Sequence, residues 1–113
     1  MKKNILFLLT TLLITGCSAS DKIDKSILPN DYFTQELEKE DKKLNGAYKQ
    51  AKKDIEPFRV ESLKEMQRTW IKYRDQKCDF YYHKRSGSGG ITESLECKLE
   101  MTLHRTKELI NIH

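Results

Sequence analysis

Apolar side chains recur at helical spacing along three stretches of the chain. In the first stretch, after residue 30, the repeating apolar positions are Leu37, Leu44, Tyr48, Ala51 and Ile55. Charged residues fill most of the positions between them, so the pattern predicts a helix with one buried stripe. Asn30 or Asp31 can cap its start. Gly46 weakens this stretch, and a break near Leu44 is the alternative to one continuous helix.

The second stretch carries a stripe that mixes apolar and polar side chains. Pro57 ends the first helix, because Glu56 before it is disfavoured in helical geometry, and proline suits the first turn of the next helix. We predict this second helix from Pro57 to Tyr82, in the middle of a small bundle. Its stripe consists of Leu63, Gln67, Trp70, Arg74, Cys78 and Tyr81.

The third stretch follows a segment rich in serine and glycine, residues 83–90, which predicts a loop. Thr92 can cap a third helix that runs to about Ile110. We expect its apolar side to consist of Leu95, Leu99, Thr102, Leu103, Thr106 and Ile110. No strand-like alternation occurs, so the fold class is all-α: a small bundle of three antiparallel helices.

The N-terminus has the features of an export signal. Lys2 and Lys3 precede residues 5–14, which are almost entirely apolar but too short to span a bilayer comfortably. Ile14-Thr15-Gly16-Cys17 then resembles a bacterial lipobox, in which the cysteine is lipidated; an ordinary signal peptide is the alternative. We expect a signal peptide over 1–16, a lipid-anchored flexible tether over 17–29 and a folded domain over 30–113. Ser18 after the cysteine suggests the periplasmic face of the outer membrane.

The remaining cysteines, Cys78 and Cys97, form a pair 19 residues apart. In an oxidising compartment they are expected to form a disulfide, which would stabilise the fold by roughly 3 kcal/mol. Zinc held by Cys78, His83 and Cys97 is the competing interpretation, but the spacing lacks the usual ligand pairs.

Charge and motifs exclude several classes of function. The chain has a formal net charge of +4, and removal of residues 1–16 leaves 19 basic and 17 acidic residues. So slight an excess does not indicate nucleic-acid binding. Ser86 and Ser88 do not lie in a nucleophile elbow, and no phosphate-binding loop is present. We therefore expect a protein that is not an enzyme and binds no cofactor or metal.

Several short segments resemble one family. The segment LNGAYK covers residues 44–49, QRTWIKYRD followed by Cys78 covers 67–78, and Gly89-Gly90, Cys97 and Thr102–Arg105 close the pattern. Together they resemble the LprI-type lysozyme-inhibitor family of small exported bacterial proteins, over residues 40 to 110. The resemblance implies a helical, disulfide-closed domain in the cell envelope that inhibits lysozyme. Its motif residues, expected to be structural, are Tyr48, Gln67, Trp70, Tyr73, Arg74, Asp75 and Arg105.

Trp70 and Arg74 each have two interpretations. Trp70 is expected in the core, with an exposed binding aromatic as the alternative. Arg74 can stack on Trp70 or pair with a carboxylate, and a ligand-binding arginine is the alternative. Gln67 and Tyr48 are expected in the same network, and Arg105 beside a carboxylate or on the surface. The candidate partners of Arg74 are Glu38, Asp41, Glu100 and Glu108.

The predicted loop is the candidate site of partner binding. A muramidase cleft is lined by two carboxylates, which a protruding loop with basic and hydroxyl groups could occupy. The loop residues are His83, Lys84, Arg85, Ser86 and Ser88. The chain's balanced charge favours a target less basic than animal-type lysozymes. The alternative functions are an envelope accessory lipoprotein, or an immunity protein against a cell-wall-degrading effector.

Overall fold

The computed structural model describes residues 29–84 and 87–113. The predicted signal peptide and the lipidation site at Cys17 lie outside these ranges, as do Arg85 and Ser86. The described chain forms helix α1 (Pro29–Asp54), a 3-10 turn η1 (Pro57–Arg59), helix α2 (Val60–Lys84) and helix α3 (Ser88–Ile110), and it contains no strand. The all-α prediction is confirmed. None of these helices is long and apolar enough to cross a membrane.

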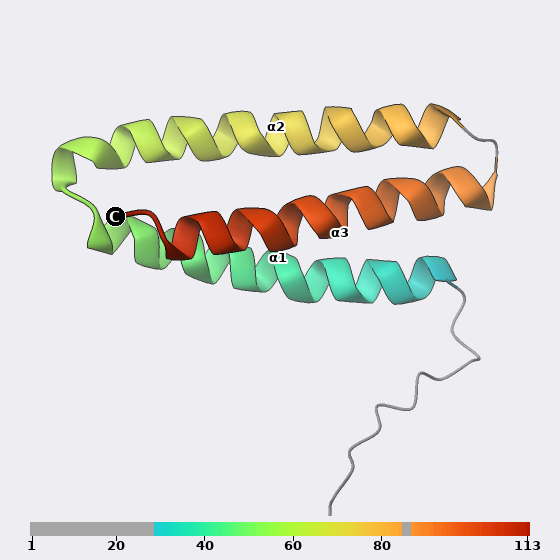
Figure 1. Ribbon diagram of the computed structural model, residues 1–113, viewed down its shortest axis with the longest axis horizontal. Coiled ribbons are helices and arrows are strands. Elements are labelled where there is room, and N and C mark those ends of the chain that lie inside the picture. The colour runs from blue at the N-terminus through green and yellow to red at the C-terminus, as the bar shows by residue number, and fades with distance from the viewer. Residues whose placement is uncertain (1–28, 85–86) are drawn as a thin grey trace, which may run out of the picture.

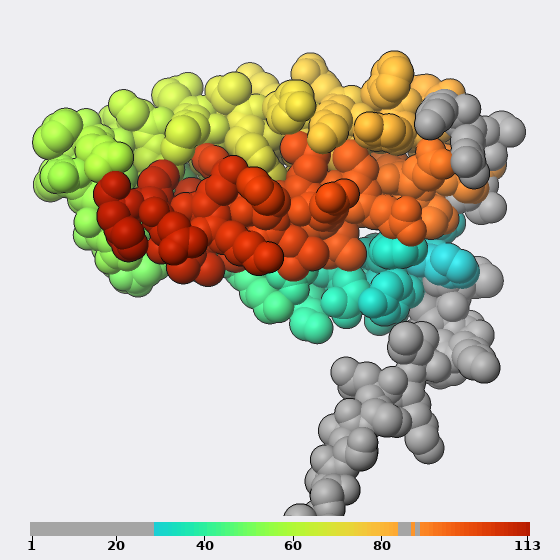
Figure 2. Space-filling view, in the orientation of Figure 1, coloured from blue at the N-terminus to red at the C-terminus, as the bar shows by residue number. Residues whose placement is uncertain are grey.

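The three helices form a bundle in which successive helices run antiparallel (Figure 1). Helix α3 lies between α1 and α2 and packs against both, whereas α1 and α2 have little direct backbone contact. The space-filling view shows α3 flanked by α2 and α1 (Figure 2). The expectation that the Trp70-bearing helix is central was therefore wrong. The long side chain of Arg74 on α2 reaches Asp41 on α1, although the backbones of these two helices are not in close contact.

The apolar core is small and lies toward the end where α1 stops and α2 starts. Its buried members come from all three helices: Leu44, Ala51, Ile55, Leu63 and Leu109. The first helix is continuous through Gly46, because Leu44 and Ala51 on either side of this glycine are buried in the same core. Their packing offsets the roughly 1 kcal/mol penalty of a helical glycine.

The connection between α2 and α3 is shorter than the sequence predicted. His83 and Lys84 belong to α2, and Ser88 to Gly90 belong to α3. Gly87 has a φ of 72°, in the left-handed region that glycine enters without steric penalty, and this permits a tight turn.

Thr92 does not cap α3, which starts four residues earlier at Ser88. Its hydroxyl donates instead to Oδ1 of Asn30 over 2.5 Å and so joins the first turn of α1 to α3. Within the described residues, α1 begins at Pro29, so Asn30 and Asp31 lie inside its first turn. The second helix likewise differs at its start, since Pro57 opens η1 and α2 begins at Val60.

The buried face of α3 was predicted only in part: Thr102 was expected inside and is fully buried. Leu103 and Ile110 were expected inside but are 40% and 60% exposed, respectively. The buried positions are Gly90, Ser94, Thr102, Arg105 and Leu109. Thr102 and Arg105 are accommodated on this face by hydrogen bonds with Arg74 and Gln67 of α2, although Nη2 of Arg105 is buried without a partner among the described residues.

Candidate binding groove

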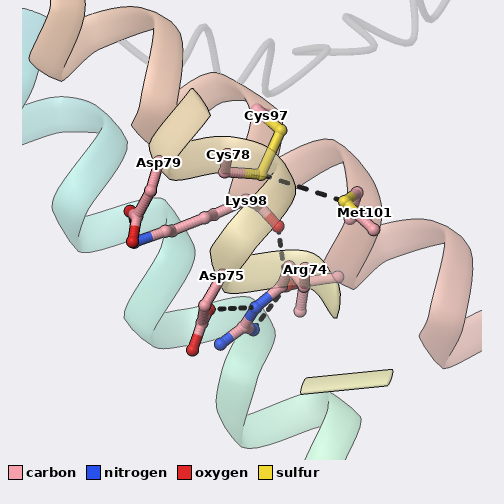
Figure 3. The surroundings of a disulfide bond; sticks show 8 residues. Arg74, Asp75, Cys78, Asp79, Cys97, Lys98 and Met101 are labelled. Atoms are coloured by element: carbon pink, nitrogen blue, oxygen red, sulfur yellow. Dashed lines mark hydrogen bonds and ion pairs between the residues drawn. A yellow bond between two sulfur atoms is a disulfide. The ribbon is translucent and has the colours of Figure 1, made fainter. Parts of the chain in front are cut away.

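A disulfide joins α2 to α3 between Cys78 and Cys97, with Cα atoms 5.5 Å apart (Figure 3). Cys78 is fully buried, and Cys97 is half-buried. The Sδ atom of Met101 lies 3.8 Å from Sγ of Cys78, so the bridge has apolar packing on the α3 side. The predicted disulfide is confirmed, and the zinc alternative is wrong because both thiols are used in the bond. Within the described ranges, no three His, Cys, Asp or Glu side chains are grouped to hold a metal ion.

Arg74 connects all three helices one turn before the bridge. Its side chain is only 12% exposed and donates to Oδ1 of Asp41 over 2.9 Å and to Oγ1 of Thr102 over 3.0 Å. It also donates to Asp75 over 3.1 Å, and the Thr102 hydroxyl donates to the Lys98 carbonyl over 2.7 Å (Figure 3). Asp41 is thus the carboxylate on another helix that pairs with Arg74, whose Nε and Nη1 groups donate within the bundle.

Arg105 forms a second polar link between α2 and α3. Its Nε donates to Oε1 of Gln67 over 3.0 Å, and its Nη1 donates to Glu108 over 2.8 Å. The guanidinium groups of Arg74 and Arg105 lie 5.3 Å and 5.8 Å from the ring centre of Trp70. Trp70 is half-buried and packs against the apolar core. It therefore joins that core to both arginines through cation–π contacts.

Two of the motif tyrosines, Tyr48 and Tyr73, lie outside this network. Tyr48 packs beside the core and has the Nζ of Lys52 4.7 Å from its ring centre. Gln67 bonds Arg105, which meets Arg74 at the ring of Trp70, so the expectation of a shared network is confirmed for Gln67. It was wrong for Tyr48, which has no hydrogen bond to either arginine in the described part of the chain. Tyr73 is 56% exposed on α2.

A groove of about 600 Å³ lies between α2 and α3 beside the disulfide. Helix α2 contributes Trp70, Lys77 and Tyr81 to it. Helix α3 contributes Glu93, Glu96, Cys97, Glu100, Met101 and His104. The groove combines an apolar surface, made by two aromatic rings, a disulfide and a thioether, with carboxylates on one side.

The charge of the groove is negative on balance. Three glutamates on α3, at positions 93, 96 and 100, share one face of the helix because their spacing is 3 and 4 residues. Glu96 and Glu100 are exposed, and neither makes an ion pair with a described residue. Lys77 is the one lysine that lines the groove. Sequence reasoning missed this site, although the spacing of the glutamates was a readable signal for it.

The predicted partner-binding loop is not brought into this groove. His83 is exposed in α2, with its ring against that of Tyr82, and lines a separate hollow of about 420 Å³. The backbones of Lys84 and Ser88 are helical. Their side chains, like Arg85 and Ser86, lie outside the described part of the chain, so binding by this segment stays a prediction.

Comparison with known proteins adds the family. The model of a family described as "Lysozyme inhibitor LprI" matches residues 17–109, which is most of the chain. The chain belongs to the LprI family. No curated protein and no solved structure matches it. Membership places this LprI protein among exported envelope proteins and in a family known as inhibitors.

Proposed function

We propose that this LprI protein is a lipid-anchored envelope protein that binds and inhibits a lysozyme or another peptidoglycan hydrolase. The observation that supports this most is the family match, which spans the whole described bundle up to Leu109. The match starts at Cys17, the residue that we predict is lipidated. The anchor would hold the domain at the periplasmic face of the outer membrane, and residues 18–28 would complete the tether.

Inhibition by protein contact requires a surface that can cover the substrate cleft of the hydrolase. A stable interface buries about 800 Å² on each partner, with aromatic side chains near its centre. Tyr73 and Phe80 on α2 are 56% and 72% exposed. They are seven residues apart and so lie on one side of the helix, next to the positions of Lys77 and Tyr81 in the groove. This aromatic row and the groove offer a contact surface on the α2–α3 side of the bundle.

The bundle contributes steric exclusion and no chemistry of its own. A muramidase cleaves its glycan between two carboxylates, and the reaction stops when a bound protein keeps the glycan out. The disulfide holds α2 and α3 at a fixed separation. Binding would therefore require little ordering of the contact surface, which lowers the entropic cost of association.

The test is an inhibition assay with the purified full chain in non-ionic detergent. Its targets are a basic animal-type lysozyme, a phage-type muramidase and a bacterial lytic transglycosylase. The proposal expects saturable inhibition of at least one of them at a stoichiometry of one to one. Full activity of all three, in the presence of protein with a helical circular dichroism spectrum, would contradict it. Mass spectrometry of the envelope protein, with Cys17→Ser as the control, tests the lipid anchor.

A further inference from the structure

We propose that the groove between α2 and α3 binds a lysine or arginine side chain on a basic surface of the partner protein. This inference rests on the proposed function, and it specifies the chemistry of the partner. It differs from the expectation based on net charge, which favoured a target of low basicity.

The distribution of the carboxylates supports a cationic occupant. Elsewhere in the described chain, acidic side chains commonly pair with a basic residue one turn away, as in Glu61 with Lys64 and Glu65 with Arg68. Glu96 has no basic residue one turn away, and the one such neighbour of Glu100, His104, pairs instead with Glu108 over 3.2 Å, although both glutamates line a groove. The negative charge at this place is therefore not cancelled locally, and it attracts cations within about a Debye length of 10 Å.

The apolar surface of the groove suits the stem of a long basic side chain. Lysine and arginine bury their methylene groups against apolar surface while the charged head stays near polar groups. Tyr81 of α2 provides an aromatic ring and Met101 of α3 a thioether. Trp70 already has two guanidinium groups against it from within the bundle, so we assign the stacking to Tyr81 and the charge pairing to the glutamates.

Lys77 is the groove residue that opposes this binding. It lines the same groove and makes no ion pair with a described residue. A cation that enters would be repelled by its ammonium group, whereas an anion would be repelled by Glu96 and Glu100. Because the carboxylates outnumber the ammonium group, the balance favours the cation.

The probe is a capped tetra-arginine peptide, and the signal is the fluorescence of Trp70. This residue is the only tryptophan of the chain and lines the groove. The double variant Glu96→Gln/Glu100→Gln is compared with the matched control Asp31→Asn/Glu38→Gln, which removes two exposed carboxylates from α1. All proteins are measured as full chains in non-ionic detergent at low and at physiological salt.

The proposal expects saturable quenching, with a Kd that rises about tenfold in the groove variant and less than twofold in the control, since each exposed ion pair contributes modestly. Lys77→Gln should lower the Kd about threefold. Equal losses in both double variants, or equal binding of tetra-glutamate, would overturn it. So would sedimentation that shows a dimer which only the groove variant dissociates, because the occupant would then be a second copy.

The two proposals fail in different ways. If a hydrolase is inhibited equally by the wild type and the groove variant, this inference is overturned and the proposed function stands. If no hydrolase is inhibited while tetra-arginine still discriminates between the two double variants, the proposed function is overturned and the preference of the groove for cations stands.

Discussion

Where α1 stops and α2 starts, Leu63 and Leu109 pack with buried side chains of α1, whereas toward the α2–α3 connection the helices are joined by a disulfide and polar contacts. The first half is stabilised by removal of apolar surface from water, at about 25 cal/mol per Å². The second half contains the Cys78–Cys97 bridge and Arg74 one turn before it (Figure 3), and Arg74 donates there to Thr102. A covalent link there replaces the apolar packing that the sequence does not supply.

This difference explains where a binding site can exist. An apolar core has to be closed over by side chains, but a half held by a disulfide tolerates an open groove with carboxylates beside it. The groove adjoins the bridge itself, since Cys97 lines it. The bundle is therefore stabilised by its apolar core in one half, and the disulfide allows an accessible groove in the other half.

The largest effect is expected in the apolar half. Leu109 is 1% exposed, and Leu109→Ala should lower the free energy of unfolding by about 2–5 kcal/mol through lost burial and a residual cavity. Urea denaturation followed by circular dichroism measures it. The control is Ile110→Ala at the neighbouring exposed position, where a change within about 0.5 kcal/mol is expected. Equal losses would show that Leu109 is not at the core.

Removal of the disulfide should have the next largest effect, confined mainly to the other half. Cys78→Ala/Cys97→Ala is expected to lower the free energy of unfolding by about 3 kcal/mol, because the bridge closes a loop with a sequence separation of 19. Hydrogen exchange should accelerate more near Thr102 than near Leu63. Uniform acceleration along the chain would contradict a division of the bundle into two halves.

A smaller effect is expected from the polar link between α2 and α3. Thr102→Val keeps the shape but removes the oxygen that accepts from Arg74, and should cost about 1–2 kcal/mol of unfolding free energy. Thr106→Val is the matched control, since the Thr106 hydroxyl bonds the carbonyl one turn back in its own helix. If both variants lose the same stability, the contact with Arg74 contributes nothing to the fold.

The smallest effect is expected on the exposed surface of α2. The hydrogen bond and positive charge of Lys64 lower the pKa of Glu61 below its ordinary value. A lowered folded-state pKa stabilises the fold above the ordinary carboxyl pKa, and this contribution disappears as the pH falls through the lowered value. Because Glu61 is exposed, Glu61→Gln should leave the urea midpoint unchanged at neutral pH within error. A clear shift would contradict a solvent-screened pair.

The sequence predicted the parts of the fold that depend on repeating side-chain patterns. Leu44 and Ala51 on α1, and Leu63 and Cys78 on α2, were expected on buried stripes and are buried. Each of these residues recurs at helical spacing with other members of its stripe, so the periodicity within one helix is sufficient to predict its burial. The disulfide needed only the count of cysteines and the compartment.

The buried face of α3 and the groove depend on contacts between helices, which no single stretch encodes. Arg105 was expected beside a carboxylate or on the surface, and its pair with Glu108 confirms the first; its burial depends on Gln67 from another helix. The glutamates of the groove were not recognised as a site, and Glu100 was considered only as a partner of Arg74. That they line a groove together with Tyr81 follows from the packing of α3 against α2. The net charge of the chain sums these glutamates with lysines elsewhere in the sequence, so it does not reveal a local cluster of negative charge.

The measurement that tests the account most directly is hydrogen–deuterium exchange of the full chain with and without an inhibited hydrolase. We expect slowed exchange in the complex along the groove, at the amides near Tyr81 on α2 and between Glu96 and Met101 on α3, while the exposed side of α1 around Glu38 is unchanged. Slowed exchange confined to α1, with none along α2 and α3, would contradict the assignment of the groove as the surface that binds the partner.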